Sequence, residues 1–292
     1  MIPSNKTQQL RETLFRQALQ KSLRVRTAVG GDVETPLCIY SVCKKRGVIV
    51  RFNDINMEGM YDRTPRPRIH LSAFRPLVRR NFNCAHELGH HEFGHGTSVD
   101  EIKSNSSTEY KHPNEILADA FAGYLMMPTL GIRRSFSSRG IDPERASSEQ
   151  IYTIARNFGV GYTTLVNHLS LGMGLVSQIG RARLLRTNPR EISQQFLEGA
   201  PCRSLIIVDQ HWTAPTIDAE EGSLVWLPKN TKLCSNIAVY EKRLNGGDLY
   251  RAVKVGVGRL HSERRSWATY LRVSAQDYVG LAEYRHMEAC DE

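Results

Sequence analysis

The chain has 292 residues, of which 40% are hydrophobic, enough to build more than one packed core. No stretch approaches the roughly 18 to 20 apolar residues of a membrane helix, and residues 1–26 lack the apolar run of a secretion signal. The cysteines stand apart rather than in the close pairs of thiolate zinc or redox sites. We therefore expect a soluble, multidomain protein of the cytoplasm.

The net charge of +9 comes partly from a cluster of arginines. Its members are Arg63, Arg66, Arg68, Arg75, Arg79 and Arg80. Such a cluster can meet nucleic acid or an acidic protein, but arginines spread over a loop also form ordinary solvated surface. Charge alone does not decide between these interpretations.

The first half of the chain predicts helices around two short strands. Apolar residues recur at helical spacing over Thr7 to Leu23, and a second helix is expected over Pro36 to Arg46, before Gly47. The next elements expected are paired strands over 48–52 and 68–72, then helices over 75–93 and 114–127.

The second half predicts a helix pair and then a β-rich region. After a polar linker over 135–145, residues 147–171 indicate two helices with a turn at 159–162. After Pro201, four apolar, β-branched runs separated by turn residues predict strands. These runs are 204–208, 223–227, 237–240 and 250–255.

The sequence His86-Glu87-Leu88-Gly89-His90 has the spacing of a zinc-binding helix. Histidines four residues apart project from one helical face and can bind one ion, while Glu87 can accept a proton from water activated by the metal. The competing interpretation is a pair of ordinary helix histidines. Small and apolar neighbours favour the metal site, because they let this helix pack closely.

A catalytic zinc needs a third protein ligand from elsewhere in the chain. His91 lies about 100° around the helix from His90, and His95 follows a helix-breaking glycine, so both are weaker candidates. Glu115 is favoured, with Asp119 one turn later to accept the free N–H of a ligating histidine. The alternative for this acidic pair is helix surface.

Two motifs together resemble the ImmA/IrrE family of zinc peptidases. The first is Arg79-Arg-Asn-Phe-Asn-Cys-Ala-His-Glu-Leu-Gly-His90, and the second is Glu115-Ile-Leu-Ala-Asp-Ala-Phe-Ala-Gly-Tyr-Leu-Met-Met-Pro128. Asp119 stands where many members have asparagine, which preserves a hydrogen-bond acceptor. The resemblance implies a gluzincin-like metallopeptidase with a fold similar to the thermolysin group.

The resemblance also implies roles for individual residues. His86, His90 and Glu115 would bind the metal, zinc or else manganese, and Glu87 would be the catalytic base. Stabilising the oxyanion needs a further donor, for which Tyr61, His70 and Tyr124 are candidates, each with an ordinary structural role as the alternative.

The fold class expected is α+β, with four parts along the chain. These are an N-terminal helix (1–35), a mainly helical zincin-like peptidase domain with a small sheet (36–135), a helix-turn-helix-like segment (136–190) and a β-rich C-terminal domain (200–292) that could sense a ligand or bind a partner. Family members of this length cut a DNA-binding repressor and so switch on a stress response or a mobile element. A helix-turn-helix repressor is therefore the expected protein substrate.

Direct DNA binding by the helix-turn-helix-like segment is the less favoured alternative. Its second helix offers only uncharged or weakly basic side chains to DNA, with no arginine or lysine. These are Tyr162, Thr163, Thr164, Asn167 and His168. Two other readings stay open: a DNA-binding regulator with a structural metal site, and a zinc hydrolase acting on something other than peptide bonds.

Overall fold

The computed structural model describes residues 5–96, 98–100, 112–262 and 268–287. The chain forms two compact units, each treated by itself below. The first is Met1–Ile132 with Val279–Ala282, and the second is Arg133–Tyr278 with Glu283–Glu292. The mixture of helices and small sheets confirms the expected α+β class. The four-part division stays a prediction.

The first unit contains a five-stranded sheet in the order β13-β1-β3-β2-β4. Its strands are β1 (Ile49–Asn53), β2 (Gly59–Asp62), β3 (Arg68–Ser72), β4 (Ser98–Asp100) and β13 (Gly280–Leu281). The expected pairing of β1 with β3 is confirmed, and the two strands run parallel. Strand β2 is antiparallel to β3 and was not expected from the sequence.

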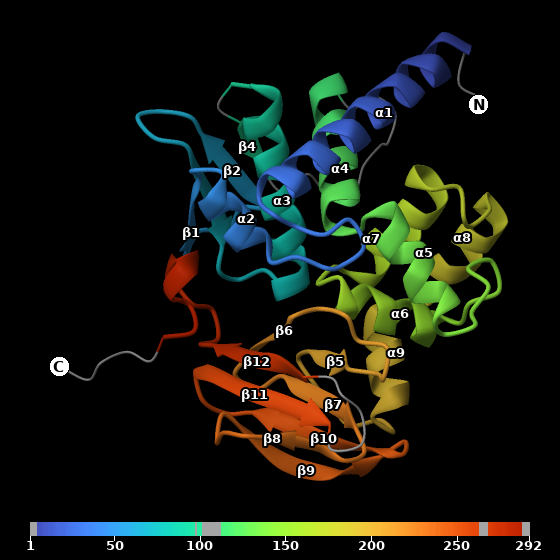
Figure 1. Ribbon diagram of the computed structural model, residues 1–292, viewed down its shortest axis with the longest axis vertical. Helices are drawn as coiled ribbons and strands as arrows, with labels where there is room; N and C mark the ends of the chain where they lie inside the picture. The colour runs from blue at the N-terminus through green and yellow to red at the C-terminus, as the bar shows by residue number, and fades with distance from the viewer. Residues whose placement is uncertain (1–4, 97, 101–111, 263–267, 288–292) are drawn as a thin grey trace. The chain divides into compact units, whose positions relative to one another are not determined.

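Four helices accompany this sheet (Figure 1). They are α1 (Asn5–Ala28), α2 (Ile39–Lys45), α3 (Leu77–Phe93) and α4 (Pro113–Met126). Phe52 of β1 is fully buried, and its ring contacts Tyr40 of α2 and the guanidinium of Arg80 of α3. Helices α2 and α3 therefore cover one face of the sheet, and α4 packs on α3.

A buried arginine ties α1 to the C-terminal end of α4. Arg26 is fully buried and donates hydrogen bonds to the carbonyl oxygens of Leu125, Asp32 and Thr35. Burial lowers the pKa of Arg26 to about 10, so its guanidinium stays charged at neutral pH. Positive charge at the last turn of a helix also complements the helix dipole. This contact holds α4, the helix that carries Glu115, against α1.

The helical part of the second unit contains the expected helix pair. Helices α6 (Ser148–Asn157) and α7 (Tyr162–Asn167) flank the turn, and a π-helical turn (His168–Gly172) extends α7. The expected linker over 135–145 is partly helical, because α5 (Thr129–Ser137) runs into it. Its apolar residues Ile132 and Phe136 lie four apart and are buried, which explains the helix. Helices α8 (Gln178–Leu185) and α9 (Pro189–Phe196) were not predicted.

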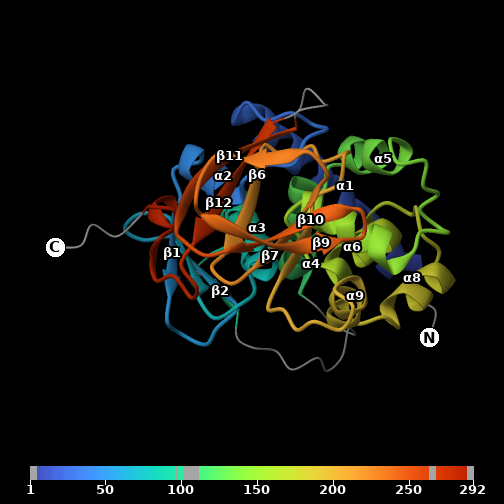
Figure 2. The same cartoon turned by 90° about the horizontal axis from the view of Figure 1, so that it is seen from below.

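The rest of the second unit is β-rich, as expected, and holds two four-stranded sheets (Figure 2). The first has the order β5-β7-β10-β9, formed by Leu205–Ile207, Leu224–Pro228, Gly247–Ala252 and Ala238–Leu244. The second has the order β6-β12-β11-β8, formed by Thr216–Glu220, Ala268–Ser274, Gly256–Ser262 and Thr231–Leu233. Buried side chains from both sheets share one apolar core.

No helix within the described ranges is both long enough and apolar enough to span a membrane.

Candidate functional site

Helix α3 presents two buried histidines on one face. The helix begins after Pro76 and ends at Gly94, whose left-handed conformation (φ 70°) terminates it. His86 and His90 are separated by one turn, and their Nε2 atoms lie 3.1 Å apart. Both side chains are buried, so the spacing seen in the sequence produces a pair of imidazoles that face one another.

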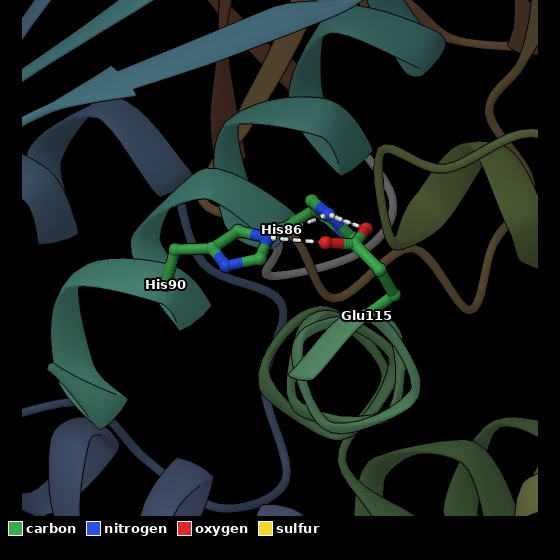
Figure 3. A group of neighbouring side chains, drawn as sticks. All are labelled: His86, His90 and Glu115. Carbon is green, nitrogen blue, oxygen red and sulfur yellow. Dashed lines mark hydrogen bonds and ion pairs between the residues drawn. The ribbon is translucent and has the colours of Figure 1, made fainter. Parts of the chain in front are cut away.

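Glu115, in the first turn of α4, completes a group of three side chains. Its carboxylate oxygens lie 3.4 Å from Nε2 of His86 and 3.6 Å from Nε2 of His90 (Figure 3). The two helices approach closely because residue 89 is glycine: a Cβ there would lie 3.1 Å from the Cα atom of Ala118. Gly89 thus permits the contact that brings Glu115 to the histidines.

The distances between the two imidazole nitrogens and the carboxylate oxygens of Glu115 are compatible with a small tetrahedral metal ion. Bonds of about 2.0 to 2.1 Å in tetrahedral geometry place neighbouring ligand atoms about 3.3 Å apart. The two Nε2 atoms are 3.1 Å apart, and each lies 3.4 or 3.6 Å from one of the two carboxylate oxygens of Glu115, so all three distances are near that value. Across the described part of the chain, these side chains form the group whose His, Cys, Asp or Glu ligand atoms converge, all within 4.8 Å of one another. The cluster is a candidate metal site.

Asp119 lies behind His86, on the side away from this cluster. Its Oδ1 atom is 2.9 Å from Nδ1 of His86. A carboxylate accepts the Nδ1–H of a neutral imidazole and thereby leaves the lone pair on Nε2, which is the atom that faces Glu115. The structure brings Asp119 to the position that the sequence predicts for it.

Glu87 is fully buried between α3 and strand β2. A Cβ at Gly59 would lie only 2.8 Å from Oε1 of Glu87, so the backbone of β2 passes directly beside this carboxylate. Gly59 is a residue that sequence reasoning missed. A glycine at the start of a short strand that the sequence does not predict gives no signal that it contacts Glu87.

The two weaker ligand candidates lie outside the cluster. The Nδ1 atom of His91 is 2.8 Å from the hydroxyl of Tyr61, and Nδ1 of His95 is 3.0 Å from Nδ1 of His90. Burial lowers the pKa of both His91 and His95, which favours neutral rings. Their contacts are with neighbouring side chains rather than with the point where the three ligand atoms meet.

The three candidates for oxyanion stabilisation occupy different places. Tyr61 is buried, faces α3 and uses its hydroxyl in the contact with His91. His70 pairs with Met60, whose side chain points to the face of the sheet opposite that of Tyr61. The Nδ1 atom of His70 contacts the side-chain amide of Asn53. His70 is therefore not brought to the cluster.

Tyr124 follows Glu115 by nine residues on α4, which is about 180° around the helix. Its ring packs edge-on against Phe15 of α1. Tyr124 is thus directed away from the cluster, and Tyr61 is the one of the three candidates on the side of α3.

Two of the five residues expected on the recognition surface of the helix-turn-helix-like segment are buried, and the other three are at least partly exposed. Tyr162 and His168 are buried, and the hydroxyl of Tyr162 donates to the carbonyl of Leu184. Asn167 accepts a hydrogen bond from Arg181 of α8, which brings an arginine beside α7 that the sequence pattern did not indicate.

Residues 43–170 match the peptidase family M78, described as the IrrE N-terminal-like domain. This match confirms the resemblance drawn from the two motifs. The match includes α3 and α4 with the cluster, and it continues through α6 and α7. None of the curated proteins matches the chain.

Proposed function

We propose that this chain is a zinc-dependent, site-specific endopeptidase that cleaves a regulatory protein, a helix-turn-helix repressor, and so triggers a stress or mobile-element response. In this proposal His86, His90 and Glu115 bind the metal, and Glu87 is the catalytic base. The class of substrate rests on the family resemblance. The peptidase activity rests on the family match, and the metal-assisted hydrolysis rests on the site.

The observation that carries the proposal is the convergence of the two Nε2 atoms and the Glu115 carboxylate at zinc-like separations. Imidazole nitrogen and carboxylate oxygen both suit zinc, and three protein ligands leave a fourth position for water or substrate. A structural zinc normally closes that position with a fourth protein ligand. Among the described side chains the converging group has three members, which favours a catalytic over a structural metal.

A bound zinc ion supplies Lewis-acid chemistry, polarising a carbonyl group and lowering the pKa of water. Glu87 then acts as the proton carrier: its carboxylate accepts the proton lost by the attacking water and delivers it to the leaving nitrogen. Asp119 holds the ring of His86 in the tautomer that ligation requires. The burial of Glu87 beside Gly59 limits the positions that its carboxylate can adopt.

The proposal is tested by co-expressing the chain with helix-turn-helix repressors encoded beside it and searching for shortened repressor by mass spectrometry. Glu87→Gln keeps the shape of the side chain but cannot accept the proton, so we expect cleavage to fall by about 10²- to 10⁴-fold. Zinc content, measured by elemental analysis of the purified protein, should stay at the parent level.

The matched control is Glu92→Gln, which removes another carboxylate of α3, one that pairs with Arg46 rather than lying near the cluster. It should cleave like the parent. Cleavage by Glu87→Gln at the parent rate would contradict the catalytic role of Glu87. An effect on transcription that persists in Glu87→Gln would favour the alternative of a DNA-binding regulator with a structural metal. Hydrolysis of a non-peptide ester or amide, without cleavage of any repressor, would favour the alternative of a zinc hydrolase that does not act on peptide bonds.

A further inference from the structure

The second ligating histidine has a partner of its own on the side of the ring away from the cluster. His90 directs Nε2 toward His86 and Glu115, and its other ring nitrogen, Nδ1, lies 3.0 Å from Nδ1 of His95. The centroids of these two rings are 5.1 Å apart. The arrangement parallels the contact between His86 and Asp119, but the partner is an imidazole instead of a carboxylate.

Metal binding through Nε2 of His90 determines which atom of the His90–His95 contact donates the hydrogen bond. A neutral imidazole carries one N–H and one lone pair, so a lone pair on Nε2 of His90 requires the proton to be on Nδ1. His90 is buried, and a buried N–H without an acceptor is unfavourable. Nδ1 of His95 lies at hydrogen-bond distance from that proton and can accept it, provided that the proton of His95 is on its own Nε2.

The end of α3 explains how His95 reaches this position. Gly94 adopts the left-handed conformation that reverses the chain, and the backbone N–H of His95 donates to the carbonyl of His90 at 3.0 Å. The ring of His95 stacks on Phe93, with centroids 5.8 Å apart and planes inclined by 19°. Phe93 in turn packs edge-on against Phe121 of α4. Backbone and side-chain contacts together hold the imidazole beside His90.

We propose that His95 is a positioning residue, which accepts the Nδ1–H of His90 and so holds His90 in the tautomer and orientation that bind the metal. The inference rests on the proposed function, since it concerns the same metal site. Two different acceptors, Asp119 and His95, then orient the two ligating histidines.

The same geometry argues against His95 as a fourth ligand. The ring of His90 stands between His95 and the point where the ligand atoms converge, because its two nitrogens face opposite sides. The converging group within the described chain accordingly consists of His86, His90 and Glu115.

The test is the zinc affinity of two substitutions, measured by competition with a chromophoric chelator. His95→Phe keeps a ring to stack on Phe93 but removes the acceptor, and loss of such a partner typically weakens metal binding by about 10- to 100-fold. His95→Asn places an amide oxygen near the former position of Nδ1, so it should restore affinity to within about threefold of the parent.

Two control variants distinguish the loss of a hydrogen-bond acceptor for His90 from a general disturbance of the fold. His91→Asn changes the neighbouring histidine, which contacts Tyr61 instead of His90, and it should leave zinc affinity unchanged. His95→Leu removes the acceptor with a smaller side chain and should reproduce the loss seen with His95→Phe, which covers the case in which phenylalanine disturbs the fold. In ¹⁵N-labelled, zinc-loaded parent protein, coupling between the Nδ1 atoms of His90 and His95 would report the hydrogen bond directly.

The outcomes distinguish this inference from the proposed function. Equal zinc affinity in the parent, His95→Phe and His95→Leu overturns the positioning role and leaves the peptidase proposal standing. An asparagine variant as weak as the phenylalanine variant also overturns it, because the acceptor would then not be the relevant group. If the parent binds zinc tightly, the His95 variants bind it more weakly as expected, and the parent cleaves no repressor, the role of His95 is supported and the proposed function is contradicted. A parent that binds no zinc overturns both.

Discussion

The two units differ in the partners that surround their partly or fully buried polar side chains. In the first unit, two imidazole nitrogens and a carboxylate, all groups that can donate lone pairs, converge between α3 and α4. In the second unit, Asp218 of β6 meets opposite charge: it accepts two hydrogen bonds from Arg272 of β12 at 2.5 and 2.7 Å, and Arg285 lies 3.6 Å away.

The difference supports the cluster in the first unit as the candidate site for an external ion. Burial alone raises the pKa of Asp218, but the charges of Arg272 and Arg285 outweigh it and hold that pKa below its usual value. This group therefore contains its own counter-ions. The cluster of His86, His90 and Glu115 gathers electron donors, and a cation is the partner that satisfies all three together.

The largest effect is expected where the internal ion pair is broken. Asp218→Asn leaves the buried guanidinium of Arg285 and the largely buried one of Arg272 without their carboxylate. Removing one partner of a buried pair lowers the free energy of unfolding by about 3 to 5 kcal/mol. Chemical denaturation measures this loss, and zinc affinity under native conditions should not change. Asp277→Asn is the matched control, because its pair with Arg203 is exposed and worth about 0 to 1 kcal/mol.

The pH dependence of the same pair has a definite sign. The pKa of Asp218 is lowered by folding, so its contribution to stability is present above the unfolded value, about 3.9, and is lost as pH falls through the folded one. The stability difference between the parent and Asp218→Asn should therefore shrink in acid below about pH 4. A difference that stays constant down to the acid transition would contradict the pairing.

Removal of the metal should lower the stability of the first unit, which holds the cluster of His86, His90 and Glu115. An ion present at about a thousandfold its dissociation constant adds about 4 kcal/mol to the free energy of unfolding of the structure that binds it. Amide hydrogen exchange with and without zinc should show added protection in α3 and α4, and none in β7 and β10. His86→Ala should abolish the difference. Equal protection of both units would contradict a metal site confined to the first.

The part of the site that could be predicted is the part encoded by helical spacing. His86 and His90 lie one turn apart, and Glu115 and Asp119 repeat that spacing on a second helix with an apolar face, so the sequence alone indicates four side chains on two packed helices. The distances that make them a single site depend on the close approach at Gly89.

The elements that escaped prediction depend on contacts between distant parts of the chain. Strand β2 is short and begins at glycine, and β13 pairs with β1 across more than two hundred residues, so neither leaves a periodic signal. The sequence makes His95 a weaker candidate ligand, because Gly94 breaks the helix before it. That same break turns the chain back and brings His95 to His90, a reversal that the periodicity of α3 cannot show.

The smallest of these effects on free energy is expected at the contact between strand β2 and helix α3. Gly59→Ala would place a methyl group 2.8 Å from Oε1 of Glu87, so the carboxylate must shift. The three heavy atoms nearest to that methyl group all belong to Glu87 and none to His86 or His90, so the proposed metal ligands should stay in place. A displacement of about 1 Å at a catalytic group can lower the rate by about 10²-fold, so repressor cleavage should fall by that factor at unchanged zinc affinity. Gly96→Ala is the control, because a Cβ there meets no atom within 4 Å. Unchanged cleavage by Gly59→Ala would mean that β2 does not hold Glu87 in place, whereas a parallel loss of zinc would mean that the strand supports the whole cluster.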